Sequence, residues 1–241
     1  MNNNNKILII GHRGANNIAP ENTLKAFKKA IELEADFIEF DVQMSRDGEL
    51  VITHDLDIER LTGEKKYVKD LTLDELKSKD FGDGEKIPTL EELIKETKGK
   101  ICLNCEIIVE GITSKVVDIL RKYDVIGTTI VSSFKHEELL KIQKLEPDLK
   151  LASLEPTKYL SEYKWDLKQE MLKFCISNKL FAINPFYPLV DQQFVDYTHK
   201  YNINVFPWTV DSKPSIRKLI KYGVDGIITN DITRVKDILN G

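Results

Sequence analysis

Short apolar runs alternate along the chain with longer stretches in which apolar positions recur every three or four residues. The apolar runs predict strands near residues 6–11, 36–42, 101–107, 128–133, 149–154, 180–184, 203–208 and 225–229. The amphipathic stretches predict helices near residues 22–33, 89–97, 112–122, 135–145, 167–177, 191–200, 212–221 and 231–239. Strands that alternate with helices of this length predict parallel β-α-β units. Eight such units favour a closed (β/α)8 TIM barrel, an α/β fold, over an open doubly wound sheet. No glycine-rich dinucleotide fingerprint follows the first strand.

The alternation is interrupted once, between residues 43 and 88. Within it, Asp47-Gly48 is a hairpin turn signal, because both residues accept the positive φ angles of a tight turn. The turn would fold residues 49–53 back beside the second strand, and a short helix is expected near 73–79. We therefore predict one TIM-barrel domain over residues 1–241, with a small insertion after the second strand at approximately 43–88. Insertions at this end of a barrel commonly shape substrate access.

Composition and charge narrow the classes of function. The 241 residues fit one barrel domain, and 41% hydrophobic with 31% charged residues is an ordinary globular balance. A net charge of −4 argues against a nucleic-acid-binding protein, which needs a basic face to neutralise phosphates. A single phosphodiester remains a suitable ligand if a metal or a local arginine supplies positive charge. No apolar run approaches the roughly 18 residues of a membrane span, so we expect a cytoplasmic protein without stable membrane association.

The three cysteines cannot all pair in disulfides, which agrees with a reducing compartment. Cys102 and Cys105 form a C-x-x-C pair, but no second pair completes a four-ligand zinc site. Redox pairs of this kind begin a helix, whereas these two residues fall within a predicted strand, where side chains three apart face opposite sides. We expect two ordinary buried cysteines.

The predicted strands end on polar residues, and in a TIM barrel the carboxyl ends of the strands carry the chemistry. Glu39 and Asp41 lie two apart on the second strand, so their side chains share one face. Glu106 ends the third strand, Asn184 the sixth and Trp208 the seventh. Neighbouring carboxylates repel unless a cation neutralises them, and three hard oxygen ligands suit Mg²⁺ or Ca²⁺. The three acids therefore predict a divalent-cation site, with ordinary surface ion pairs as the alternative.

Two of the four histidines follow strands near this cluster. His12 follows the first strand and His54 follows the return arm of the hairpin. Together they would form the pair that acid–base hydrolysis requires, in which one takes a proton from the nucleophile and the other protonates the leaving alkoxide. Beside His12, Arg13 has a planar fork that matches two phosphate oxygens, and a surface salt bridge is its alternative role. His136 and His199 fall in predicted helices and are expected at the surface.

In this combination the chain resembles the glycerophosphodiester phosphodiesterase family over nearly its whole length. The matching motifs occur in order: GHRG at 11–14, PENT at 20–23, EFDV at 39–42, DGELVITHD at 47–55, IPTL at 87–90 and LNCE at 103–106. Weaker matches are SSF at 132–134, PWTV at 207–210 and GVDGI at 223–227. Any one of these is weak, but the first four together are highly specific.

The resemblance implies a reaction and its residues. The family cleaves glycerophosphodiesters to glycerol 3-phosphate and an alcohol, in some relatives through a cyclic phosphate. By this likeness His12 and His54 are the acid–base pair and Arg13 holds the phosphate. One divalent cation, Mg²⁺ or Ca²⁺, would be bound by Glu39, Asp41 and Glu106 and would polarise the phosphoryl oxygens.

One departure from the family pattern concerns a cation. Where the family usually has a lysine two residues beyond the third-strand glutamate, this chain has Ile108. Losing such a group should weaken phosphate binding by about 2–4 kcal/mol, unless another lysine such as Lys158 replaces it, or the substrate differs. Glu155 at the same end adds an unexpected negative charge. Trp208 at the mouth would form an apolar wall of the substrate pocket, with ordinary core packing as its alternative role. Glu21 would order the loop near His12 and cap the next helix.

Three functions follow from these observations. The leading one is metal-dependent hydrolysis of small glycerophosphodiesters. A lysophospholipase D-type activity would use the same site, but half of residues 55–88 are charged, which disfavours contact with lipid. A non-catalytic barrel that binds a phosphorylated ligand is suggested by Ile108, yet such a protein needs no histidine pair. The preferred alcohol, the native metal and the oligomeric state are left open.

Overall fold

A computed structural model describes residues 6–158 and 164–241 of the chain. Eight parallel strands and one antiparallel strand form a single sheet in the order β8-β7-β6-β5-β4-β2-β1-β9, with β3 paired to β2. The parallel strands are β1 (Leu8–Gly11), β2 (Phe37–Met44), β4 (Cys102–Ile107), β5 (Thr129–Ser133), β6 (Lys150–Glu155), β7 (Ala182–Pro185), β8 (Asn204–Val205) and β9 (Gly226–Thr229). All eight predicted strands are present.

The sheet closes on itself between β8 and β9. The Asp225 amide donates to the Val205 carbonyl at 3.1 Å, and the Ile228 amide donates to the Pro207 carbonyl at 3.0 Å. The strand was predicted to reach residue 208, but β8 ends at Val205. Two residues later, Pro207 has no amide hydrogen and supplies only its carbonyl to this contact. The nearly closed ring, together with the structural relatives described below, confirms the predicted TIM-type barrel.

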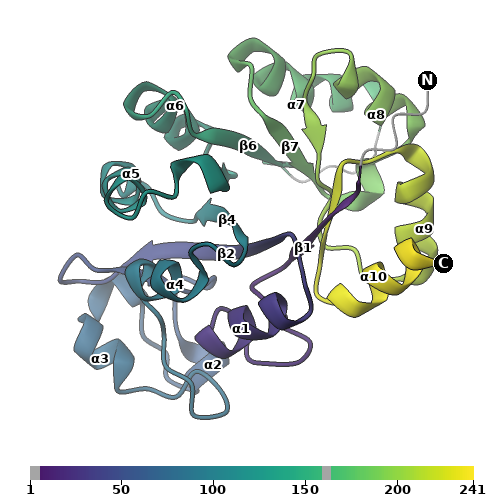
Figure 1. The fold of residues 1–241 in the computed structure, drawn as a ribbon. Coiled ribbons are helices and arrows are strands. Elements are labelled where there is room, and N and C mark those ends of the chain that lie inside the picture. Colours follow the sequence, from purple (N-terminus) through teal and green to yellow (C-terminus); the bar gives the residue numbers. More distant parts are fainter. Residues whose placement is uncertain (1–5, 159–163) are drawn as a thin grey trace.

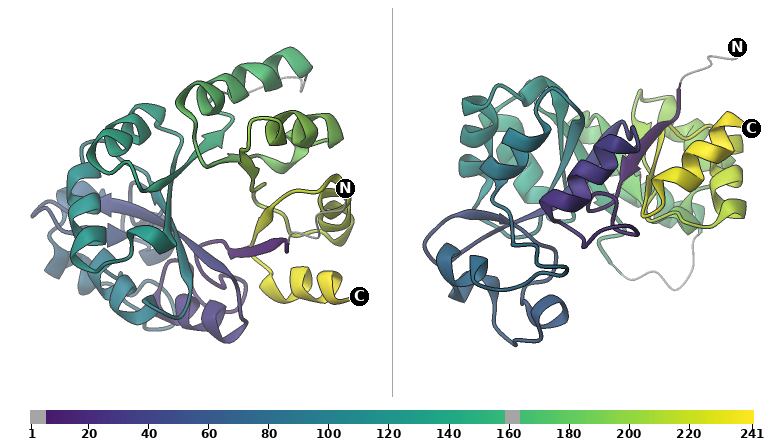
Figure 2. Two further views of the ribbon diagram at one scale, coloured as in Figure 1. Left: turned by 45° about the horizontal axis from the view of Figure 1, so that its top comes forward. Right: turned by 60° about the horizontal axis from the view of Figure 1, so that its bottom comes forward.

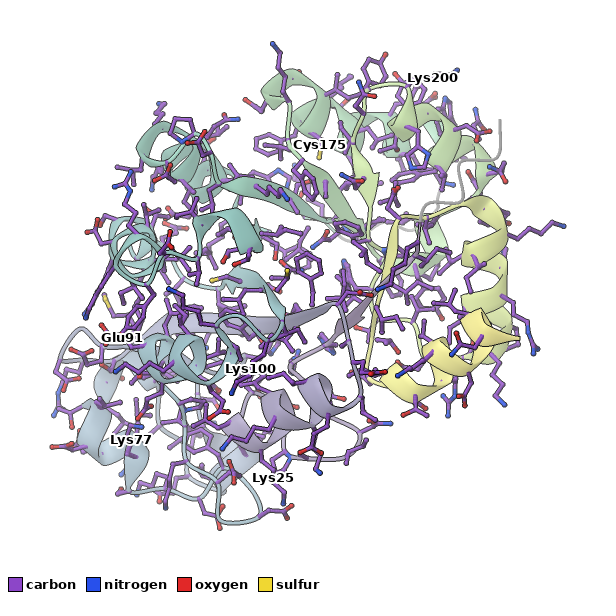
Figure 3. All side chains as sticks on the ribbon, in the orientation of Figure 1. Lys25, Lys77, Glu91, Lys100, Cys175 and Lys200 are labelled. Atoms are coloured by element: carbon purple, nitrogen blue, oxygen red, sulfur yellow. The ribbon has the colours of Figure 1, made fainter. Side chains whose placement is uncertain are left out.

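Helices follow the parallel strands and cover the outside of the ring (Figures 1 and 2). They are α1 (Leu24–Glu32), α4 (Leu90–Thr97), α5 (Thr113–Lys122), α6 (His136–Leu145), α7 (Trp165–Asn178), α8 (Gln192–His199), α9 (Lys213–Tyr222) and α10 (Ile232–Asn240). Charged side chains such as Lys25, Lys100 and Lys200 project from this outer layer, whereas Cys175 lies inside it (Figure 3). In the part of the chain that the structure describes, no helix has the length and apolarity to cross a bilayer.

Strand alternation creates two apolar layers. On β2, Ile38, Phe40 and Val42 face outward and are fully buried against the helices. Inside the ring, alternate residues of the other strands form a smaller core, which comprises Ile10, Ile130, Ala152, Ala182, Phe206 and Ile228. This inner core fills the barrel below the carboxyl ends of the strands. Polar residues that point inward nearer the carboxyl ends therefore lie above a packed apolar layer and not above an open channel.

The segment between β2 and α4 forms the predicted hairpin and a small lobe. Strand β3 (Leu50–Ile52) pairs antiparallel with β2, with Val42 opposite Ile52. The lobe, which Figure 2 shows projecting beyond the barrel, contains α2 (Glu59–Thr62), a 3-10 turn and α3 (Leu73–Lys77). It packs its own apolar cluster, which includes Val51, Ile58, Leu76 and Phe81.

Two predictions about single residues are wrong. Cys105 is buried on β4, but Cys102 is only partly buried, because it begins the strand at the open lower edge of the sheet. His136 is not a surface residue: its ring stacks on Phe174, with centroids 4.2 Å apart, between α6 and α7. His199 is more exposed and bonds to Asp225 at 2.8 Å.

Candidate active site

The carboxyl ends of the strands surround a cavity of about 110 Å³. Six of the seven predicted site residues line it, and the seventh, Asp41, adjoins it through the carboxylate cluster. The complete lining is His12, Arg13, Glu39, His54, Glu106, Ser132, Phe134, Leu154, Asn184, Trp208, Thr209 and Ile228. The structure therefore brings together residues that lie far apart in the sequence.

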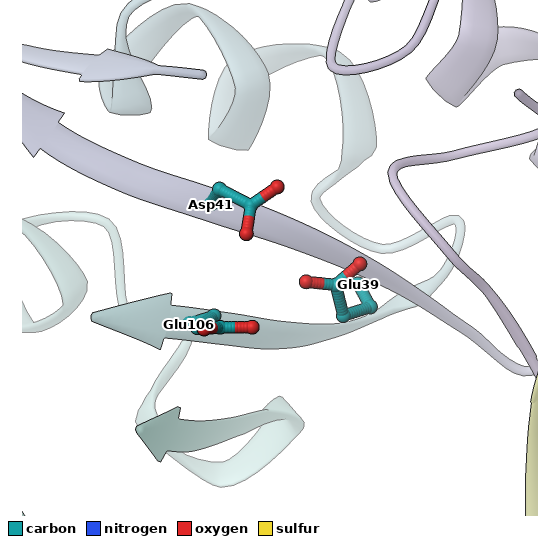
Figure 4. Close-up of side chains that lie close together, drawn as sticks. All are labelled: Glu39, Asp41 and Glu106. Atoms are coloured by element: carbon teal, nitrogen blue, oxygen red, sulfur yellow. The ribbon is translucent and has the colours of Figure 1, made fainter. Parts of the chain in front are cut away.

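Three carboxylates gather on one side of this cavity (Figure 4). Glu39 and Asp41 project from one face of β2, and Glu106 projects from β4, where it is the register partner of Asp41. Each offers an oxygen atom within 4.8 Å of the others. Burial, followed by the charge of Asp41, raises the pKa of both Glu39 and Glu106 well above the ordinary value. One oxygen of Glu39 is buried without a hydrogen-bond partner.

This donor set fits a hard divalent cation. Three carboxylates this close together are unfavourable as neighbouring anions, and a bound cation reverses the sign of that interaction. The unpartnered Glu39 oxygen provides a free ligand atom, and oxygen-only ligation is what Mg²⁺ and Ca²⁺ prefer. The three acids therefore form a possible metal site.

Arg13 is held beside the acids by a strained backbone. Its φ angle is 53°, a region that a non-glycine residue seldom adopts. The turn places the Arg13 amide 2.9 Å from Glu39, to which it donates. The guanidinium lies 2.8 Å from Glu21 and 3.4 Å from Asp41, and its Nε atom is buried without a hydrogen bond. The next residue must be glycine, because a Cβ on Gly14 would lie 2.8 Å from the backbone of Ala26.

His12 is partly buried and is oriented by the end of β9. Its Nδ1 lies 2.7 Å from the Asn230 side-chain oxygen, which also accepts a bond from Asn16. The Asn230 amide in turn donates to Asp211 at 2.7 Å. Since an amide oxygen only accepts, Nδ1 carries the proton and Nε2 is left unprotonated, 4.0 Å from Glu39. Burial lowers the pKa of His12 and the adjacent Arg13 lowers it further, so the ring is neutral at neutral pH.

His54 is oriented by a different set of charges. Its Nδ1 lies 2.8 Å from Asp55, whose other oxygen accepts a bond from Arg60 at 2.6 Å. Arg60 also donates to Glu21 at 2.7 Å, and Glu21 pairs with Arg13. A continuous chain of ion pairs thus joins the loop that carries His54 to the loop that carries Arg13.

Glu21 does not have the predicted helix-capping role. The side chain that caps α1 is Thr23, which accepts from the Ala26 amide. Glu21 instead bridges Arg13 and Arg60, and these partners lower its pKa despite its burial. A sequence pattern does not reveal this bridge, because Arg60 comes from the inserted lobe.

Gln43 was not predicted, although it continues the alternation of Glu39 and Asp41 on the same face of β2. Its buried amide group donates to three successive carbonyls, those of Thr53, His54 and Asp55, at 2.8–3.0 Å. These bonds fix the backbone from which the His54 ring projects. The two-residue spacing of positions 39, 41 and 43 could have predicted that Gln43 shares the face of Glu39 and Asp41.

The missing family lysine is not replaced by the residue suggested for that role. Ile108 follows β4 and lines a second cavity of about 490 Å³, which shares His54, Glu106 and Phe134 with the first. Lys158 lines a separate cavity beside His136 and Glu155. Among the described residues, Arg13 is the one permanently cationic side chain in the lining of the first cavity.

Glu155 lies outside the first cavity and lines the separate cavity that contains Lys158. Its side chain is only 2% exposed and is 3.3 Å from His136, and burial raises its pKa to about 7. Trp208, by contrast, lies in the predicted place: its indole nitrogen donates to the Asn184 carbonyl at 2.8 Å, and its ring meets Phe134 edge-on. The indole is therefore a fixed apolar wall.

Comparisons with known proteins agree with this geometry. Residues 12–234 match the model of the glycerophosphoryl diester phosphodiesterase family. A glycerophosphodiester phosphodiesterase from Caldanaerobacter subterraneus is 38% identical, covering 94% of this chain and 95% of the relative. A putative glycerophosphodiester phosphodiesterase from Bacillus subtilis is 33% identical over 92% of this chain and 93% of its own length.

Solved structures with the same fold include two informative relatives. A putative glycerophosphoryl diester phosphodiesterase from Silicibacter pomeroyi superposes with a TM-score of 0.88 at 25% identity, covering 98% of this chain and 94% of that one. A phosphodiesterase from Oleispira antarctica, in complex with the product sn-glycerol-3-phosphate, superposes with a TM-score of 0.85 at 25% identity, covering 97% of each chain.

Proposed function

We propose that this chain, which belongs to the glycerophosphoryl diester phosphodiesterase family, hydrolyses small glycerophosphodiesters to glycerol 3-phosphate and an alcohol. The observation that carries this proposal is the single cavity in which two histidines, one arginine and the carboxylate cluster converge. The Caldanaerobacter and Bacillus relatives described above are named as phosphodiesterases, and the Oleispira structure contains the product sn-glycerol-3-phosphate. The finer assignments below rest on the geometry of this chain.

Glu39, Asp41 and Glu106 would hold one divalent cation, Mg²⁺ or Ca²⁺. When bound, the cation supplies Lewis-acid polarisation of the phosphoryl oxygens. Arg13 lies beside these acids and lines the cavity, so its guanidinium would bind a phosphate oxygen from the neighbouring side. With Ile108 in the lysine position, Arg13 carries this electrostatic task without a second permanent cation.

The two histidines have distinct roles in this proposal. His12, neutral and with its Nδ1 proton held by Asn230, has a free Nε2 lone pair that takes the proton of the attacking oxygen. His54 has its Nδ1 bonded to Asp55, so its Nε2 can deliver a proton to the departing alkoxide. The assignment uses the different Nδ1 partners of the two rings, a neutral amide oxygen for His12 and a carboxylate for His54.

The size of the cavity favours a small substrate group over a lipid. About 110 Å³ is well below the roughly 300–1,000 Å³ of sites for larger ligands. A glycerol unit suits such a space, whereas an acyl chain does not. We therefore favour a water-soluble diester over a lysophospholipid.

The test is release of glycerol 3-phosphate from glycerophosphocholine and glycerophosphoethanolamine, with Mg²⁺, with Ca²⁺ and with a chelator. We expect activity that a chelator abolishes, and a loss of about 10²–10⁴-fold in kcat for His54→Ala. His199→Ala is the matched control, because His199 also bonds a carboxylate but lies at the opposite end of the barrel, beside the start of β9. Full activity in chelator would contradict the metal assignment, and near-normal activity of His54→Ala would contradict the proton assignment.

A further inference from the structure

Polar side chains without partners lie inside the mouth of the barrel. The hydroxyl of Ser132 and both amide atoms of Asn184 are buried and make no hydrogen bond to any described residue. Both residues have no exposed surface, and both line the 110 Å³ cavity. A buried polar group without a partner costs roughly 1–3 kcal/mol, so these groups call for a ligand or ordered water.

Strand register explains why both side chains point into the cavity. Ser132 lies two residues beyond Ile130, and Asn184 lies two residues beyond Ala182. Ile130 and Ala182 belong to the inner core of the barrel. Because side chains two apart share a face, Ser132 and Asn184 form a polar layer directly above that apolar floor.

The two groups approach the cavity from different sides. Ser132 is the register partner of Glu106, so its hydroxyl lies next to the carboxylate cluster. Asn184 lies two strands further, on β7, and its backbone carbonyl is already used by the Trp208 indole. Its side-chain amide has no partner among the described residues, and it offers one acceptor and one donor group beside an aromatic wall.

The chemistry of these groups fits neutral hydroxyls better than phosphate. The Asn184 side-chain oxygen only accepts, and it would repel an anionic oxygen. A hydroxyl both donates and accepts, so it can satisfy the amide oxygen or the amide nitrogen, and also the Ser132 hydroxyl. The apolar faces of Trp208 and Leu154 in the same lining suit the carbon backbone of a small polyol.

We propose that Ser132 and Asn184 bind the free hydroxyl groups of the glycerol unit, so that the cavity selects a glycerol ester over a plain alkyl ester of the same phosphate. This inference rests on the proposed function, because it assumes that the phosphodiester lies at the carboxylate cluster. It places the glycerol inside the barrel mouth, under Trp208. The alcohol that leaves then lies toward the larger second cavity, beside Ile108 and His54.

The experiment compares two phosphocholine esters that differ by one oxygen atom. One is sn-glycero-3-phosphocholine, and the other is the ester of propane-1,2-diol, which lacks the terminal hydroxyl but keeps the hydroxyl next to the phosphoester carbon. The second ester can still react if that neighbouring hydroxyl is the nucleophile. The measured quantity is the ratio of kcat/KM for the glycerol ester to kcat/KM for the propanediol ester.

We expect the unmodified protein to prefer the glycerol ester by about tenfold or more. Asn184→Leu and Ser132→Ala should each reduce this preference, by roughly threefold to tenfold, through slower reaction of the glycerol ester alone. Ser133→Ala is the matched control: Ser133 is the next residue of β5 and equally buried, but its hydroxyl bonds to the Ile107 carbonyl at 2.7 Å. That variant should leave the preference unchanged.

Binding provides a second readout that does not depend on hydrolysis. Calorimetric titration of the Mg²⁺-loaded protein with sn-glycerol 3-phosphate and with propane-1,2-diol 1-phosphate should give the same preference as a ratio of Kd values. Equal affinities, or a preference that both variants retain, would overturn the inference and show that water satisfies these groups. If the protein hydrolyses neither ester but still prefers glycerol 3-phosphate, the proposed activity fails while the hydroxyl site stands.

Discussion

Replacing Glu106 with glutamine should change protein stability in opposite directions with and without metal. Without a cation, Glu106 is a buried carboxylate beside Glu39 and Asp41, and burial with these charges raises its pKa. Ionisation of Glu106 is less favourable in the folded protein than in the unfolded chain. The folded protein therefore loses stability as the pH rises through the raised pKa of Glu106. The neutral amide of Glu106→Gln removes that cost and should stabilise the metal-free protein most at pH values above the raised pKa.

The structure sets the size of the effect. Two unit charges 4.8 Å apart, the distance within which the ligand oxygens of the cluster all lie, repel by about 3.5 kcal/mol at an effective dielectric constant of about 20. Protonation relieves part of this repulsion and Arg13 offsets another part, so the net relief in the variant is smaller. Relief of about 1–3 kcal/mol corresponds to a Tm increase of roughly 2–12 °C for a domain of this size.

A bound cation reverses the comparison. At a metal concentration about 100 times Kd, binding stabilises the unmodified protein by about 2.7 kcal/mol, whereas the variant has lost one of three ligands. The unmodified protein should therefore melt at a higher temperature in Mg²⁺ than in chelator, and Glu106→Gln should show little difference between the two.

The assay is thermal unfolding at pH 8, in chelator and in 10 mM MgCl₂ or CaCl₂ (about 100-fold over a Kd of roughly 0.1 mM). Glu110→Gln is the matched control, since Glu110 follows the same strand but its side chain is 72% exposed. Its Tm should hardly change in either condition. A Glu106→Gln variant that is less stable than the unmodified protein in chelator would refute the electrostatic reasoning, and a Tm indifferent to metal in the unmodified protein would refute the cation site.

Three further changes test separate parts of the molecule. Gln43→Leu removes the three hydrogen bonds that hold the His54 loop, so kcat should fall by about tenfold or more while the metal-induced rise in Tm persists. An unchanged kcat would show that the loop needs no such support. Burial raises the pKa of Glu155 from 4.5 to about 7, so its charged form destabilises the folded protein at high pH. In urea unfolding, Glu155→Gln should therefore stabilise the protein by up to about 3 kcal/mol at pH 8.5 and by little below pH 4.5. Equal effects at both pH values would contradict this. Ile108→Lys should lower KM for glycerophosphocholine and raise kcat/KM by at least tenfold, as the added cation compensates phosphate charge; lower activity would mean that the site is adapted to an apolar residue here.

Much of the fold was predictable because strand and helix periodicities are local. An inward-facing residue on a strand is followed by another two positions later, so Glu39 and Asp41 had to share a face whatever the rest of the chain did. The same rule would have included Gln43. Eight alternating strand–helix units are compatible with few closed topologies. Because the strands are parallel, all their carboxyl ends lie at one rim of the barrel.

The partners of the site residues could not be predicted in this way. The His12 ring is held by Asn230, which is 218 positions away, and the Arg13 guanidinium shares Glu21 with an arginine from the inserted lobe. Such contacts depend on where the ring closes and on how a loop folds back, and neither leaves a periodic trace in the sequence. The same applies to His136, whose burial depends on the neighbouring helix α7.

The sequence by itself determined the class of fold, the rim at which the chemistry lies and the residue types available there, because hydrophobic alternation and chemical identity are properties of the chain. Only the tertiary structure decided which of those groups are satisfied. It gave the Nδ1 atoms of His12 and His54 different partners, placed Ile108 in the second cavity, and left Ser132 and Asn184 buried without partners among the described residues. Hydrogen bonding and desolvation depend on distances of a few ångströms between distant segments, and packing alone sets those distances.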